Sequence, residues 1–104
     1  MLKAEIYLDM DEMKQDKPLH EYILEMLINE KIDGATVVKG FTGFGANQYV
    51  KKPDDLFSFD ERPIVIIFID EEEKVKQALK KIRQEINYGR VVTSQVDIWN
   101  IKND

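Results

Sequence analysis

"PIVIIFID", residues 63–70, is a proline followed by six consecutive apolar side chains and an aspartate. An apolar run of this length between such boundaries predicts a β-strand that is buried on both of its faces. Helices packed on a sheet cover only one of its faces. The stretch therefore predicts a sheet with helices on one side and an apolar surface on the other.

The residues after this strand predict a helix and a final strand. Glu71–Glu73 form an acidic first turn, which suits the positive end of a helix dipole. A buried stripe follows at helical spacing: Val75, Ala78, Leu79, Ile82 and Ile86. Tyr88–Arg90 then predict an exit turn around Gly89, and Val91 to Ile101 predict the last strand.

The residues before this strand repeat the same alternation of elements. Residues 2–9 alternate between apolar and polar side chains, which predicts a strand with one buried face. Asp9 to Lys17 is polar and is expected to be a loop, and a helix is expected to begin at Pro18. Its apolar stripe is Leu19, Tyr22, Ile23, Met26 and Leu27. Gly34 is expected to supply the backbone freedom that ends this helix, and residues 36–39 form a short strand.

This order of elements predicts an α+β fold, the ferredoxin-like sandwich with the pattern βαββαβ. Two helices would cover one face of a four-stranded antiparallel sheet. We expect a single domain over residues 1–104, with a flexible loop of about residues 41–62 between the second and third strands. The two-sided apolar strand favours a homo-oligomer in which sheet packs against sheet.

Composition excludes several classes of function. The formal net charge is −5 and no dense basic patch is present, so no nucleic-acid partner is expected. No apolar run is long enough for a membrane helix, and the absence of cysteine suits a cytoplasmic protein. His20 is the only histidine and has no evident partner in the sequence. We therefore predict no catalytic residue, no metal site and no enzyme.

Glycines and one arginine form the candidate binding site. Gly40, Gly43 and Gly45 follow the second strand, and Gly89 with Arg90 precedes the last one. Considered separately, the glycines after the second strand and the Gly89–Arg90 pair each indicate no more than a turn. In an oligomer, however, these two regions can face one another across a subunit boundary. Glycine admits a ligand close to the backbone, and arginine is a permanently charged partner for phosphate.

Two long stretches carry a resemblance to a known family. Residues 17–45, "KPLHEYILEMLINEKIDGATVVKGFTGFG", and residues 62–75, "RPIVIIFIDEEEKV", resemble the PII-like family of small uncharacterised proteins. The PII superfamily implies a homotrimer, a long loop that contacts a target protein such as a membrane transporter or an enzyme, and nucleotide sites between subunits. The resemblance assigns ligand binding to Thr36, Gly43, Gly45, Gly89 and Arg90.

The sequence also departs from the PII pattern. Residues 46–48 are Ala-Asn-Gln where PII proteins carry Arg-Gln-Lys, so 2-oxoglutarate sensing is not expected. The second basic motif of the PII phosphate site is missing, and only Lys102 lies near that position. A monophosphate or cyclic nucleotide would need fewer cations than a di- or triphosphate. The favoured effector is an adenine nucleotide; the alternatives are a ligand-independent interaction module and a metal-responsive trimer like the copper-tolerance family.

Overall fold

The structure is a computed structural model that describes residues 1–41, 63–87 and 89–100. Its strands and helices follow one another as β1 (Leu2–Asp9), β2 (Met13–Lys14), β3 (Lys17–Pro18), α1 (Leu19–Asn29), β4 (Thr36–Lys39), β5 (Pro63–Asp70), α2 (Glu72–Glu85) and β6 (Arg90–Gln95). The long loop and residues 101–104 lie outside the described residues.

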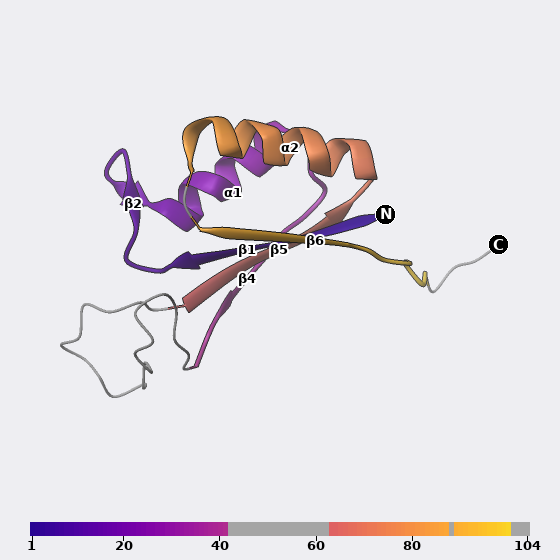
Figure 1. The fold of residues 1–104 in the computed structure, drawn as a ribbon, viewed down its shortest axis with the longest axis horizontal. Helices are drawn as coiled ribbons and strands as arrows, with labels where there is room; N and C mark the ends of the chain where they lie inside the picture. Colours follow the sequence, from indigo (N-terminus) through magenta and orange to yellow (C-terminus); the bar gives the residue numbers. More distant parts are fainter. Residues whose placement is uncertain (42–62, 88, 101–104) are drawn as a thin grey trace.

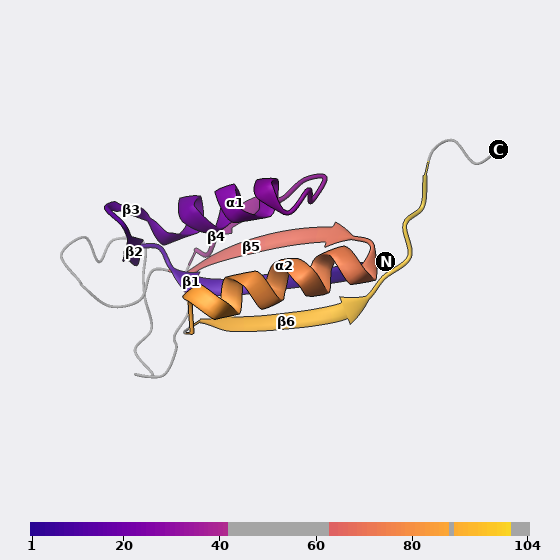
Figure 2. The same cartoon turned by 90° about the horizontal axis from the view of Figure 1, so that it is seen from above.

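The four longer strands form one antiparallel sheet in the order β4-β5-β1-β6. Figure 1 shows α1 and α2 together on one side of this sheet, and Figure 2 shows them side by side above it. Strand order, pairing and helix placement confirm the predicted α+β ferredoxin-like fold.

The core lies between the helices and one face of the sheet. Alternate residues of β1 and β5 are buried there: Leu2, Ala4, Ile6, Leu8, Ile64, Ile66 and Phe68. Helix α1 contributes Leu19, Ile23 and Leu27, and α2 contributes Val75, Ala78 and Ile82. The predicted stripes of both helices are thus core stripes, while the alternate side chains of the strands point to the uncovered face.

The polar segment before α1 was predicted to be a loop, but the structure has two short strands there. It contains a small hairpin in which Met13 pairs with Pro18 and Lys14 with Lys17. Gln15 and Asp16 both have positive φ angles, of 52° and 66°. Two consecutive left-handed residues are the requirement of a tight two-residue hairpin turn. The helix follows directly, and Pro18 is its N-cap residue.

The end of α1 is set by Lys31 rather than by Gly34. Lys31 has a φ of 67°. Its amide donates to the carbonyl of Ile28 at 3.0 Å, and the amide of Ile32 donates to the carbonyl of Leu27 at 3.1 Å. This pair of hydrogen bonds is a Schellman motif. Gly34 does not have a positive φ, so the prediction that it supplies the helix exit was wrong.

Replacing Lys31 with glycine is expected to stabilise the protein by about 0.5–1 kcal/mol, because a left-handed conformation strains any side chain. Chemical denaturation of the two proteins measures this difference. Gly34→Ala is the matched control: a Cβ there meets no atom within 4 Å, and its effect should stay within about 0.5 kcal/mol. A destabilised Lys31→Gly variant would contradict the interpretation.

The last strand is shorter than predicted. β6 ends at Gln95, and the amide of Val96 donates to the carbonyl of Met1 at 3.1 Å. The chain then leads away from the sheet (Figures 1 and 2), so Trp99, with 92% of its surface exposed, is not on a strand. Among the described residues, no helix is long and apolar enough to cross a membrane.

Candidate functional site

Four strand termini meet at one end of the sheet. Asp9 pairs with Pro63, Lys39 with Ile64, and Tyr7 with Arg90, so the ends of β1 and β4 lie beside the starts of β5 and β6. The root of the long loop therefore shares this end of the sheet with the turn before β6. The two candidate glycine regions are at the same end because the strands are antiparallel.

Gly40 closes the root of the loop. Its amide donates to the carbonyl of Pro63 at 2.9 Å, and a Cβ at Gly40 would lie 2.7 Å from Cγ of the Pro63 ring. A larger residue would therefore force the two arms of the loop apart. Gly43 and Gly45, the predicted ligand-binding glycines, lie outside the described residues.

Gly89 is the turn residue that the sequence indicated. Its φ is +85°, and a Cβ there would lie 2.8 Å from Cδ2 of Leu8 and 3.0 Å from the carbonyl oxygen of Tyr7. Both the left-handed backbone and the close approach to β1 require glycine. Arg90 follows at the start of β6, directly opposite Tyr7.

Arg90 and Thr36 lie on the same face of the sheet. Directly paired residues of antiparallel strands point to one side. Arg90 pairs with Tyr7 and Thr36 pairs with Ile67, and all four alternate with the buried core positions. Both candidate residues are therefore on the face that the helices leave open, and both are exposed.

The two residues are on opposite edges of that face. β4 and β6 are the outer strands, with β5 and β1 between them. Three inter-strand spacings of roughly 4.8 Å separate the edges by about 14 Å. One chain therefore does not bring Thr36 and Arg90 together.

The open face between them is an apolar patch. Tyr7, Val38 and Val92 are exposed to 41%, 44% and 41%. The central strand positions Val65, Ile67 and Ile69 are partly exposed beside them. Charge is present at Lys3 and Glu5, which pair with each other at 3.7 Å between Nζ and Oε2. We call the six apolar residues Tyr7, Val38, Val65, Ile67, Ile69 and Val92 the open-face patch.

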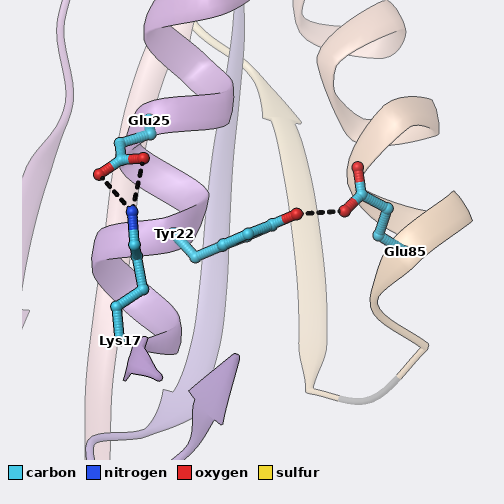
Figure 3. A network of polar contacts seen from close by, with 4 residues as sticks. All are labelled: Lys17, Tyr22, Glu25 and Glu85. Atoms are coloured by element: carbon cyan, nitrogen blue, oxygen red, sulfur yellow. Dashed lines mark hydrogen bonds and ion pairs between the residues drawn. The ribbon is translucent and has the colours of Figure 1, made fainter. Parts of the chain in front are cut away.

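A polar cluster on the other side of the sheet joins the two helices. Figure 3 shows the Tyr22 hydroxyl of α1 reaching across to Glu85 at the end of α2, with Lys17 bonded to Glu25 beside it. The hydrogen bond to Glu85 raises the pKa of Tyr22, and burial and the charges of Glu85 and Glu25 act in the same direction. Glu85 is 63 positions from Tyr22 in the sequence, so no spacing rule could have found the contact between the two helices.

Asp70 is a buried carboxylate that holds three segments together. It accepts hydrogen bonds from the amides of Asp33 at 3.0 Å and Glu71 at 2.7 Å, and its Oδ2 lies 3.2 Å from Nζ of Lys74. Burial opposes its ionisation, but the two amides and the ammonium group outweigh that effect and lower its pKa. The geometry assigns Asp70 a structural role at the start of α2.

The described residues offer little for metal chemistry. Within them, no group of three histidine, cysteine or carboxylate side chains is arranged around a common point. His20 is at the start of α1, and its Nδ1 is buried without a hydrogen-bond partner in this part of the chain.

Comparisons with known proteins agree with this architecture. The profile of the DUF190 family, described as "Uncharacterized ACR", matches residues 1–98. A UPF0166 protein of Aquifex aeolicus is 31% identical over 93 residues, which is 89% of this chain and 88% of that protein.

Two solved structures show the same fold at low sequence identity. One is CPII, a nitrogen regulatory PII-like protein from Thiomonas intermedia bound to ADP, AMP and bicarbonate; its TM-score is 0.64 at 24% identity, over 89% of this chain and 82% of CPII. The other is CutA1 from Pyrococcus horikoshii, with a TM-score of 0.63 at 10% identity, over 97% and 88% of the two chains. The match to the family profile over nearly all of its length shows that this chain belongs to the DUF190 (UPF0166) family, which has a PII-like fold.

Proposed function

We propose that this protein is a PII-like regulatory homotrimer that binds an adenine nucleotide in the clefts between its subunits. The observation that carries the proposal is the placement of Thr36 and Arg90 on one face but on opposite edges of the sheet. A site that uses both residues has to be built from two subunits. The complex of CPII with ADP and AMP supports this assignment by analogy of fold.

Assembly through the sheet follows from the open-face patch. Burial of exposed apolar surface is favourable by about 25 cal/mol per Å². If the open faces pack so that the β4 edge of one subunit lies near the β6 edge of the next, the contact is head-to-tail, and it closes into a ring of three when the rotation between neighbours is a third of a turn. A ring of three gives three equivalent clefts, each with Thr36 from one subunit and Arg90 from its neighbour.

Arg90 would be the phosphate partner in each cleft. It has no ion-pair partner among the described residues, and its guanidinium offers two parallel donors to a phosphate group. A site with one arginine, on a chain with a net charge of −5, suits a ligand of low charge, so AMP or a cyclic nucleotide is favoured over ATP. The two glycines of the loop, Gly43 and Gly45, would form the floor of the cleft.

The regulatory output would come from the loop of about residues 41–62. A nucleotide bound at its root would change how the loop contacts a target protein in the cytoplasm, which is an order–disorder mechanism of switching. No step of bond making or breaking is needed for this function, so the proposal is a sensor and not an enzyme.

The testing experiment is calorimetric titration with AMP, ADP, ATP and cyclic AMP. We expect saturable binding of at least one of them, and Arg90→Glu should weaken it at least tenfold, a loss of about 1.4 kcal/mol, without unfolding the protein. Lys80→Glu, the same charge change on the exposed side of α2, is the control and should leave the affinity unchanged.

Absence of binding at millimolar nucleotide would overturn the proposal. If a target protein were then captured equally well with and without nucleotide, the chain would be a ligand-independent interaction module instead.

A further inference from the structure

Cationic side chains meet the carbonyls at the C-terminal end of α2. The last carbonyls of a helix have no partners within the helix and carry the negative end of its dipole. Lys14 Nζ lies 3.3 Å from the carbonyl oxygen of Glu85. Arg83 donates from Nη1 to the carbonyl of Ile86 at 3.3 Å and from Nη2 to that of Gly89 at 3.1 Å.

Hydrogen bonds from Arg83 connect the buried residue Ile86 to the turn at Gly89. Ile86 is fully buried in the core, and its amide donates to the carbonyl of Ile82 at 2.8 Å. Gly89 has no side chain that could pack against its surroundings, and its backbone has the wide conformational freedom of glycine. The planar guanidinium reaches both carbonyls at once, so it holds the backbone of Gly89 at a set position relative to Ile86.

Gly89 is also confined from its other side. A Cβ built on Gly89 would come too close to the carbonyl of Tyr7 and the side chain of Leu8, so β1 lies directly against this backbone, and the next residue, Arg90, pairs with Tyr7. The backbone is thereby fixed between the guanidinium of Arg83 and strand β1. The direction in which the Arg90 side chain leaves the sheet depends on this arrangement.

We propose that Arg83 is a positioning residue for the anion site: its hydrogen bonds to the carbonyls of Ile86 and Gly89 preset the Gly89–Arg90 backbone so that Arg90 meets the phosphate group of the ligand without reorganisation. This inference rests on the proposed function. Arg83 does not contact the ligand, and it acts through Arg90. Pre-organisation of a binding group raises affinity because less conformational freedom is lost when the ligand binds.

The test uses the full chain and compares AMP with adenosine by calorimetry. The ratio of the two affinities reports the phosphate contact alone. Arg83→Met removes both hydrogen bonds and should lower the AMP-to-adenosine ratio about three- to tenfold. Arg83→Lys keeps the positive charge but loses the two guanidinium nitrogens that reach both carbonyls at once, and it should lower the ratio nearly as much. Lys80→Met, which removes one charge from the same helix, should leave it unchanged.

A double-mutant cycle separates positioning from a general effect of charge. In an Arg90→Ala background, Arg83→Met should cause no further loss of AMP affinity, because the residue through which it acts is gone. If the losses of AMP affinity add in the double variant, or if the AMP-to-adenosine ratio is unchanged in Arg83→Met, this inference is overturned and the proposed function is not affected. Failure of the unmodified chain to bind AMP overturns the proposed function together with it.

Discussion

Replacing Asp70 with alanine is expected to lower the free energy of unfolding by about 3 kcal/mol at pH 7, because the amides of Asp33 and Glu71 and the ammonium group of Lys74 all lose the buried carboxylate that accepts from them. Asp70 is only 3% exposed, so water cannot replace the carboxylate without a rearrangement. Urea denaturation at pH 7 measures the loss. Glu73→Ala, an exposed carboxylate in the first turn of the same helix, is the matched control and should cost at most about 0.5 kcal/mol.

The same carboxylate predicts a dependence of stability on pH. The pKa of Asp70 is lower in the folded chain than its unfolded value of about 3.9. Its contribution is therefore fully present above the unfolded pKa and is lost as the pH falls through the folded pKa. Between pH 5 and pH 2 the unmodified protein should lose more stability than Asp70→Ala does. If the free energy of unfolding fell equally with pH in the unmodified protein and in Asp70→Ala, the carboxylate would not be a stabilising group.

Replacing Ile67 with lysine is expected to give a folded monomer. Ile67 is at the centre of the open-face patch, opposite Glu5 on β1 and Thr36 on β4. In a free subunit the new ammonium group can pair with Glu5 across the strands, so the fold tolerates it. Within a sheet-to-sheet interface the charge would be buried, at a cost of several kcal/mol for each subunit.

Light scattering measures the mass, and circular dichroism checks the fold. Gln77→Lys places the same group on the exposed side of α2 and should leave the assembly intact. A monomeric unmodified protein, or an Ile67→Lys variant of unchanged mass, would contradict assembly through the open face. Val38→Lys, at the exposed edge of the same patch, provides a second test if Ile67→Lys does not fold.

The sequence predicted the core well because alternation and helical spacing record burial directly. The two-sided run of β5 is one example: its even-numbered residues face the helices, and its odd-numbered residues form the centre of the open-face patch. Element ends were predicted less well. Gly34 is a plausible helix exit, but the Schellman hydrogen bonds form at Lys31, where the buried side chain of Ile32 fixes the position.

The candidate site was predictable only as separate pieces. The role of Gly89 follows from turn chemistry, and the structure adds its positive φ and a close contact with β1. Arg90 was predicted from its permanent charge and from the family resemblance. That Thr36 and Arg90 share a face depends on strand register, which no single segment records. Nothing in the sequence distinguishes Arg83 from the other charged residues of α2, and its contact with Gly89 appears only when the helix and its exit turn are placed together.

The position of β1 in the middle of the sheet has a consequence for how the chain folds during synthesis. β1 leaves the ribosome before the other strands of this sheet, yet its two neighbours, β5 and β6, both lie in the second half of the sequence. Leu2 thus pairs with Asp70 and with Gln95. Contacts so distant in sequence form slowly, because a long segment of chain has to be closed first. The apolar side of β1 stays without its partners until β5 and β6 have been synthesised, and during that interval chaperones and neighbouring nascent chains compete for it.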